Sequence, residues 1–170
     1  MQKILTCLWF NNSAEEAMNF YASVFNGSPA KQKESKIVSI ARFPEMPKEG
    51  PAAGLDGKVA QGIVELEGQQ IMAFDGGPTF TFNEAASMYV HCTSQEEVDY
   101  FWEKLSHVPE AEACGWLKDK FGVSWQIIPN ALEEFMSDPD PAASGRVMQA
   151  MLQMKKLDIA ALGRAKEGKA

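Results

Sequence analysis

The chain has 170 residues, of which 45% are hydrophobic and 23% charged, and its formal net charge is −7. This composition is ordinary for a globular protein that buries a core, and it excludes an intrinsically disordered chain. Lysine and arginine are scattered except in the C-terminal tail. Because phosphate backbones are bound by basic patches, we expect no nucleic-acid partner.

The cysteines and the apolar runs indicate the cellular compartment of the protein. Cys7, Cys92 and Cys114 are odd in number and far apart in the sequence, which favours reduced thiols over a disulfide framework. The apolar run at the N-terminus is too short for a signal peptide, and no run approaches the roughly 20 apolar residues of a membrane span. We therefore expect a cytoplasmic protein without a membrane partner.

The first half of the chain shows a strand, a helix and further strands in order. Residues 4–10 are an apolar run that predicts a strand. Ser13 and Glu16 follow it with the spacing of a capping box, which predicts that a helix begins there. Residues 64–74 predict two strands joined by a turn at Gly68.

A long connection precedes those two strands. Residues 43–58 are rich in proline and glycine, a composition that predicts a surface loop. Long ordered loops in compact domains are often functional. The segment is therefore either a passive excursion or a lid over a site, and the sequence leaves both readings open.

The same order of elements returns in the second half. Residues 88–92 predict a strand, and Ser94 with Glu97 forms a second capping box that starts a second helix. Setting Ser13 against Ser94 gives an offset of 81 residues and aligns the apolar stripes of the two helices. The chain therefore contains an internal repeat.

A hairpin at residues 114–129 ends the second repeat. Its turn falls at Gly122, because glycine tolerates the backbone conformations that tight turns need. Setting Gly68 of the first half against Gly122 places Met72 opposite Gln126. These two side chains therefore occupy equivalent positions in the last strand of each repeat.

The predicted fold is α+β, with two tandem βαβββ modules that form a curled mixed sheet around a concavity, followed by C-terminal helices. The expected boundaries are 1–80 for the first module with its lid-like loop 43–58, 81–130 for the second module and 131–170 for the helical extension. Val147, Met148, Met151 and Leu152 form an apolar stripe in that extension. The stripe docks either on the module itself or on a second chain.

The methionine-rich character of that stripe favours the second chain. We therefore expect a homodimer whose interface includes residues 142–162. Light scattering that returned a monomer would contradict this expectation.

Several motifs together resemble one known family. They are the segment at 8–25, DGGP at 75–78, FNEA at 82–85, HCTSQEEVDYFW at 91–102 and CGWLKDKFGVSWQIIP at 114–129. With the tandem βαβββ pattern, they are similar to the PhnB-like branch of the vicinal oxygen chelate superfamily, the group of glyoxalase I and the bleomycin- and fosfomycin-resistance proteins. Members of this branch often carry the label 3-demethylubiquinone-9 3-methyltransferase. The resemblance covers essentially the whole chain and implies the glyoxalase/bleomycin resistance fold.

The resemblance also implies where a metal ion would bind. Metalloenzymes of the superfamily hold a divalent ion with side chains from the first and last strands of each module. The repeat carries those positions to Thr6, Ser87, Met72 and Gln126, and only Gln126 is a plausible ligand. Because a catalytic metal needs about three imidazole or carboxylate ligands, we expect neither a metal nor a cofactor here.

Few residues are candidates for catalysis. His91 shares strand parity with Ser87, so it is a candidate base, although a hydrogen-bonded structural histidine is the commoner case. Cys114 is the candidate nucleophile, although a free cysteine is more often buried. Cys7, one residue from Thr6, is expected to point away from the concavity.

The methyltransferase label requires a glycine-rich turn between a strand and a helix to hold the methyl donor adenosylmethionine. The DGGP motif at 75–78 follows a strand, but no helix begins directly after it. We therefore interpret DGGP as a structural turn.

Strand parity predicts the side chains that line the concavity. Aromatic and thioether walls with a few polar groups suit a planar apolar ligand. We therefore predict a metal-free small-molecule-binding protein. The alternative is an enzyme, either a metal-independent lyase or isomerase or the methyltransferase of the label. The expected lining residues are Thr6, Leu8, Phe10, Met72, Phe74, Ser87, Tyr89, His91, Trp116 and Gln126.

Overall fold

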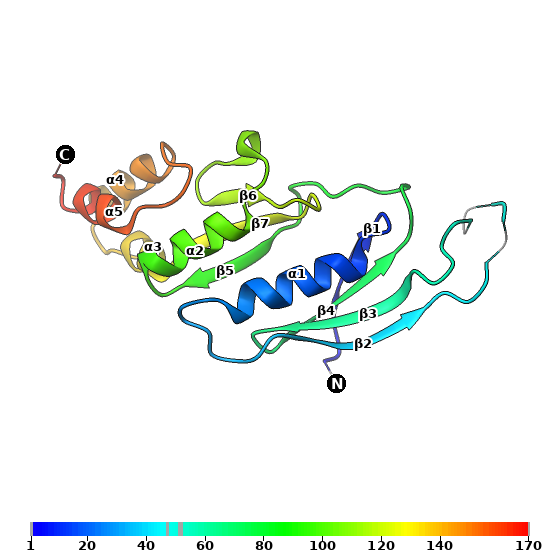
Figure 1. Ribbon diagram of the computed structural model, residues 1–170. Helices are drawn as coiled ribbons and strands as arrows, with labels where there is room; N and C mark the ends of the chain where they lie inside the picture. The colour runs from blue at the N-terminus through cyan, green and yellow to red at the C-terminus, as the bar shows by residue number, and fades with distance from the viewer. Residues whose placement is uncertain (1, 47, 51–52, 170) are drawn as a thin grey trace. The chain divides into compact units, whose positions relative to one another are not determined.

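A computed structural model describes residues 2–46, 48–50 and 53–169, and the chain divides into two compact units, unit 1 (Met1–Phe82) and unit 2 (Asn83–Ala170). Within each unit a helix packs along a sheet (Figure 1), so the predicted α+β class is confirmed.

Pro47, Pro51 and Ala52 of the expected lid lie outside the described residues, and the lid stays a prediction. No helix in the described part of the chain is long and apolar enough to cross a membrane.

Unit 1 is a βαβββ module whose four strands form one sheet. Its elements are β1 (Thr6–Phe10), α1 (Ala14–Asn26), β2 (Lys36–Arg42), β3 (Val59–Leu66) and β4 (Gln69–Asp75). The strand order is β1-β4-β3-β2, with β1 parallel to β4 and the other neighbours antiparallel. Helix α1 lies so close to β3 that a Cβ atom at Gly62 would come within 2.5 Å of the Met18 side chain. A side chain at this position would therefore have to displace the end of the Met18 side chain where the helix crosses this strand.

Unit 2 has a smaller sheet, with strand order β5-β7-β6. Strand β5 runs parallel to β7, and β6 runs antiparallel to it. The elements of unit 2 are β5 (Met88–Cys92), α2 (Gln95–Leu105), a 3-10 helix η1 (Pro109–Ala111), β6 (Trp116–Lys118), β7 (Ser124–Pro129), α3 (Asn130–Met136), α4 (Pro141–Met151) and α5 (Ile159–Lys166).

Two parts of the predicted architecture are wrong. The second module is βαββ rather than βαβββ, because the described residues between α2 and β6 form only η1 and one isolated bridge, from Ala113 to Trp116. This connection contains Pro109, which cannot donate a hydrogen bond to a strand ladder. The strands also form two sheets, of four and three strands, rather than one curled sheet.

The two main helices begin differently, although each follows a serine and a glutamate with the same spacing. In α2, Ser94 Oγ accepts a hydrogen bond from the N–H of Glu97 at 3.2 Å, as predicted. In α1, by contrast, the Ser13 side chain accepts no capping hydrogen bond from any described residue. Asp75 of β4 accepts from the N–H of Ala14 at 2.9 Å instead, so the first predicted capping box is wrong.

One extra residue separates strand from helix in unit 1. Three residues join β1 to α1, whereas two join β5 to α2. The insertion is accommodated at Asn12, whose φ of 60° is left-handed, a conformation that asparagine tolerates better than most residues. The difference in residue number between equivalent positions of the two units is therefore one residue larger for the strands β1 and β5 than for the helices α1 and α2.

The hairpin of unit 2 forms as predicted, and a carboxylate holds its turn. Asp119 accepts hydrogen bonds from the N–H groups of Phe121 and Val123, at 2.8 and 3.0 Å. Its second oxygen accepts from Nε1 of the buried Trp125 at 2.8 Å. The turn and the largest side chain of the core are thus fixed by one buried aspartate.

The C-terminal helices form a small core of their own within unit 2. Val147 is fully buried there with Ile128, Leu132, Leu157 and Leu162, and Met151 packs against this cluster. The stripe thus docks partly on its own unit, which is the alternative that the sequence favoured less. Met148 of α4 and Leu152, directly after it, remain exposed, and the homodimer stays a prediction.

Candidate functional site

Each sheet has one face covered by its helix, and we call the opposite side the distal face of that unit. On β4, Ile71, Ala73 and Asp75 are buried toward α1. The strand register pairs Cys7 with Met72 and Trp9 with Phe74. Because paired residues lie on the same side of a sheet, these four side chains share the distal face of unit 1.

The predicted parity of β1 is therefore wrong. Thr6, Leu8 and Phe10 pair with residues of β4 that face α1, and Phe10 is buried there against Phe82. Cys7, which was expected to point away, lies on the same face as Met72. The error comes from the extra residue before α1, since an alignment on the helices shifts the strand by one position and exchanges its faces.

Trp9 is the centre of an aromatic cluster on the distal face of unit 1. Its ring meets Phe74 edge to face with centroids 4.8 Å apart, and it meets Phe80 in the same way at 4.9 Å. Phe80 is 62% exposed, although its ring contacts that of Trp9. Cys7 and Met72 border the cluster, and partial burial raises the pKa of the Cys7 thiol. The face therefore presents thioether and aromatic surface without a charged group in the cluster.

The DGGP motif explains how Trp9 is held. Gly76 has no side chain, and a Cβ atom there would lie 2.2 Å from the Trp9 ring. The next residue, Gly77, has a φ of 78° and accepts a hydrogen bond from Nε1 of Trp9 at 2.8 Å. The indole thus packs on the backbone of this turn.

Asp75 gives the same motif a second structural role. The residue is 2% exposed, and its two carboxylate oxygens accept from the N–H groups of Ala14 at 2.9 Å and Val59 at 3.0 Å. The carboxylate thereby joins the first turn of α1 to the start of β3. This geometry agrees with the interpretation of DGGP as a structural turn.

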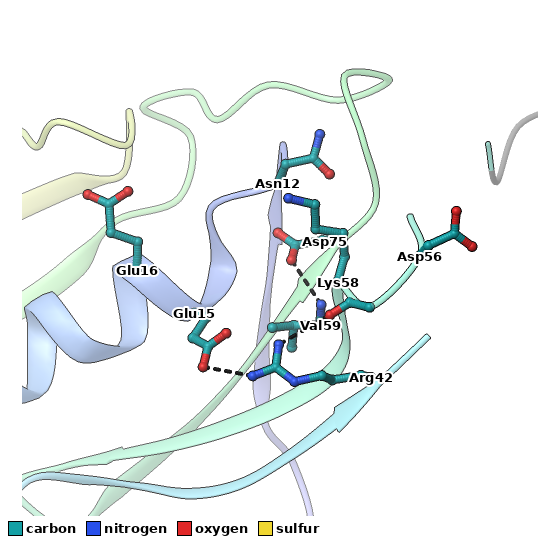
Figure 2. A pocket seen from close by; sticks show the side chains of 9 residues that line it. Asn12, Glu15, Glu16, Arg42, Asp56, Lys58, Val59 and Asp75 are labelled. Carbon is teal, nitrogen blue, oxygen red and sulfur yellow. Dashed lines mark hydrogen bonds and ion pairs between the residues drawn. The ribbon is translucent and has the colours of Figure 1, made fainter. Parts of the chain in front are cut away.

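Unit 1 also contains a pocket that the sequence did not indicate (Figure 2). Its volume is about 260 Å³. It lies where the end of β2, the start of β3 and the first turn of α1 meet. These elements are far apart in the sequence, and the pairing of the strands brings their residues together. The lining consists of Asn12, Glu15, Glu16, Arg42, Asp56, Gly57, Lys58, Val59 and Asp75.

Most charged groups of this pocket are engaged by the chain itself. Arg42 donates to Glu15 at 2.9 Å, and this contact lowers the pKa of Glu15 and raises the pKa of Arg42. Arg42 also donates to the carbonyl of Gly57, and Asp56 accepts from the N–H of Met46. Such a lining suits a small charged molecule rather than a planar apolar one.

The five predicted lining residues of unit 2 do share one side of its sheet. The register places Tyr89, Gln126 and Trp116 in one row across the three strands. Gln126 donates to Ser87 Oγ at 2.9 Å, and His91 follows Tyr89 on the same side of β5. This is the distal face of unit 2, since Val90 and Ile127 are buried on the other side.

Glu133 of α3 joins this group, and sequence reasoning missed it. Its Oε1 accepts from the Tyr89 hydroxyl at 3.1 Å and lies 3.6 Å from Nδ1 of His91. Partial burial and the neighbouring carboxylate raise the pKa of Tyr89 to about 12, so the phenol remains a donor at neutral pH. The sequence carried no signal for this contact, because α3 lies beyond the repeat.

Cys114, the other catalytic candidate, has a backbone role. Its φ of 52° is left-handed, and its N–H donates to the carbonyl of Met154 at 2.8 Å. The neighbouring Gly115 donates to Lys155 in the same way. These bonds tie the start of β6 to the segment after α4, and the thiol is half-buried.

The residues at the expected metal positions do not fit a divalent ion. The register replaces Thr6 by Cys7 as the partner of Met72, and it sets Gln126 beside Tyr89 and Ser87. These donors lack the imidazole and carboxylate groups that such ions prefer. Among the residues that the structure describes, no three histidine, cysteine, aspartate or glutamate side chains come together as a metal site.

Ser124 carries a buried hydroxyl on the same side of β7 as Gln126. It is 2% exposed, and its Oγ has no hydrogen-bond partner among the described residues. An unsatisfied buried hydroxyl costs about 1–3 kcal/mol, so Ser124→Ala is expected to increase the free energy of unfolding by roughly 1 kcal/mol in urea titrations. The matched variant Ser87→Ala loses a hydrogen bond and is expected to decrease it. Equal losses in both variants would contradict this prediction.

Known proteins are similar to this chain in sequence and fold. The family model described as 3-demethylubiquinone-9 3-methyltransferase matches residues 2–128. A PhnB protein from Bacillus cereus is 42% identical, and the match covers 74% of this chain and 97% of that chain with a TM-score of 0.56. Protein PA1353 from Pseudomonas aeruginosa is 20% identical over 74% of this chain and 95% of its own, with a TM-score of 0.54, and shows the fold alone.

No curated protein matches the sequence. The family model nevertheless spans most of the chain, and the Bacillus cereus structure matches along almost its whole length. The chain therefore belongs to the 3-demethylubiquinone-9 3-methyltransferase family, as a PhnB-like protein with the glyoxalase fold.

Proposed function

We propose that this PhnB-like protein binds a planar apolar small molecule on the distal face of unit 1, without a metal ion. The observation that carries the proposal is the cluster of Trp9, Phe74 and Phe80, whose outermost ring is 62% exposed. Exposed aromatic rings of this kind stack favourably against a further flat ring. Met72 adds a polarisable thioether that adapts to different ring shapes.

The cluster is also held in place before any ligand binds. Trp9 is fixed on one side by the backbone of Gly76 and by its hydrogen bond to Gly77. A side chain that is already ordered loses little conformational entropy on binding, so more of the contact energy appears as affinity. This rigidity distinguishes the cluster from scattered exposed apolar residues.

A neutral fluorescent probe, N-phenyl-1-naphthylamine, tests the proposal. We expect saturable binding with enhanced emission, and we expect Phe80→Ala to weaken it about fivefold to tenfold, because an aromatic pair is worth roughly 0.5–1.5 kcal/mol beyond its buried area. Phe121→Ala, in the hairpin of unit 2, is the matched control and should bind the probe like the wild type. Equal affinity in the wild type and Phe80→Ala would refute the proposed site.

Two further outcomes separate the alternatives. Probe binding that disappeared after dialysis against a chelator, and returned with one equivalent of a divalent ion, would contradict the metal-free part of the proposal. Thermal stabilisation by adenosylmethionine would instead support the methyltransferase activity in the family description.

A further inference from the structure

The pocket of unit 1 contains a cation that no described residue pairs with. Lys58 is half-buried in its wall, and its amine makes no hydrogen bond or ion pair within the described part of the chain. The other cation, Arg42, donates to Glu15 and to the carbonyl of Gly57. We propose that this pocket binds a small zwitterion, with the ligand carboxylate on Lys58 and the ligand ammonium group on Glu15. This binding goes beyond that proposed for the distal face and does not rest on it.

The pocket is built from features that distinguish unit 1 from unit 2. The extra residue before α1 is accommodated at Asn12, and Lys58 ends the long connection 43–58. Arg42 ends β2, a strand that has no counterpart in the described part of unit 2. The repeated helix and sheet of unit 2 form without any of these three features. The pocket is therefore an addition to the shared module rather than a consequence of its fold.

The backbone around Lys58 is fixed before a ligand binds. Its N–H donates to the carbonyl of Leu55, and its carbonyl accepts from the N–H of Phe43, both at 2.9 Å. The N–H of Gly57 also donates to the carbonyl of Phe43, at 3.2 Å. Because these bonds already order the wall of the pocket, a ligand has to order only the lysine side chain, and the entropic cost of binding is small.

The charges of the pocket favour a ligand that carries both signs. Its lining has four carboxylates and only two cations. A simple anion is repelled by this excess of negative charge, whereas a simple cation is repelled by the amine of Lys58. A zwitterion avoids both costs, because each of its groups can meet the opposite charge. The four carboxylates are those of Glu15, Glu16, Asp56 and Asp75.

Each end of the zwitterion has its own partner in the pocket. Figure 2 shows the Lys58 amine toward Asn12 and apart from the ion pair of Glu15 and Arg42. A ligand carboxylate accepts there from the lysine ammonium group. At the ion pair, Glu15 uses one carboxylate oxygen for Arg42, and the second oxygen accepts from no described residue. The volume of about 260 Å³ limits the ligand to about the size of an amino acid.

An NMR titration of the isotope-labelled protein tests the proposal with glycine, β-alanine, 4-aminobutyrate and 6-aminohexanoate. These zwitterions differ only in the distance between their ammonium and carboxylate groups. We expect at least one of them to cause saturable shifts at the amides of Asn12, Glu15 and Gly57. The carboxylate and the amine of the same chain length, such as butyrate and butylamine for 4-aminobutyrate, should bind about tenfold more weakly, because each lacks one charge-assisted hydrogen bond.

Variants at the two ends of the pocket separate the two contacts. Lys58→Met removes the amine but keeps a long side chain, and it should weaken binding of the zwitterion about tenfold, whereas Lys58→Arg should keep most of the affinity. Lys36→Met, at the other end of β2, is the matched control and should bind like the wild type. Glu15→Gln should weaken the zwitterion but should not weaken the carboxylate of the same chain length.

Three outcomes would overturn the proposal. The site is wrong if none of the four zwitterions causes saturable shifts up to about 10 mM, a concentration that detects even weak binding. The ligand class is wrong if the zwitterion and its matched carboxylate bind equally well. The role of Lys58 is wrong if Lys58→Met binds the zwitterion like the wild type. These results are independent of probe binding on the distal face, which the titration does not use.

Discussion

Replacement of Asp75 with alanine is expected to destabilise unit 1 by about 3–6 kcal/mol, because two hydrogen bonds to a charged acceptor are lost and each is worth roughly 1.5–3 kcal/mol. The lost bonds are those from the N–H groups of Ala14 and Val59, which then lie buried without an acceptor. Urea unfolding measures the change in free energy. Faster hydrogen exchange at these two amides would locate it.

Ser13→Ala is the control for this prediction. A serine that caps a helix contributes about 1 kcal/mol, so a working capping box would make this variant costly. The structure shows no capping hydrogen bond from the Ser13 side chain within the described residues, and Asp75 takes that role. We therefore expect Ser13→Ala to change the free energy of unfolding by less than about 0.5 kcal/mol. A larger loss in Ser13→Ala than in Asp75→Ala would contradict the assignment of the cap.

Gly76→Ala is expected to disrupt the aromatic cluster and to weaken probe binding at unit 1 by more than about tenfold, because one immobilised aromatic anchor contributes more than roughly 1.4 kcal/mol. The new Cβ atom would lie 2.2 Å from the Trp9 ring, so the indole has to move away from Phe74 and Phe80. Overpacking of this kind also costs about 1–3 kcal/mol of stability. The NMR signal of the Trp9 indole N–H reports the movement directly.

The adjacent glycine provides the control. Gly77 has a φ of 78°, and a Cβ atom there would meet no other heavy atom within 4 Å. Gly77→Ala should therefore cost about 1–2 kcal/mol from the left-handed backbone but leave the Trp9 signal and probe binding close to those of the wild type. If both variants lost probe binding equally, backbone strain rather than the position of Trp9 would explain the loss.

Local patterns predicted much of the fold. The apolar stripes placed α1 and α2, and the cap at Ser94 and the turn before Val123 are both present. These features depend on residues within a few positions of each other, so the sequence records them directly. The same local signal at Ser13 was misleading, because Asp75 competes for the helix terminus from the far end of the module.

The face of the sheet on which each expected lining residue lies was predicted less well in unit 1 than in unit 2. In unit 2 the five expected residues share the distal face, because the strand parity of β5 and β7 was correct. In unit 1 the repeat was aligned on the helices, and the extra residue accommodated at Asn12 moved Cys7 and Trp9 to the distal face in place of Thr6 and Leu8. Because successive side chains of a strand point to opposite faces of the sheet, a shift of one residue moves every side chain of the strand to the other face.

The sequence by itself determined the α+β class, the repeat, the two main helices and the final hairpin, because each follows from local periodicity and turn chemistry. Only the tertiary structure decided that Asp75 caps α1, that Trp9 packs on the DGGP turn and that Glu133 approaches His91. Each of these contacts joins residues far apart in the chain. Strand register and helix docking bring them together, and both depend on the packing of the whole unit rather than on neighbouring residues.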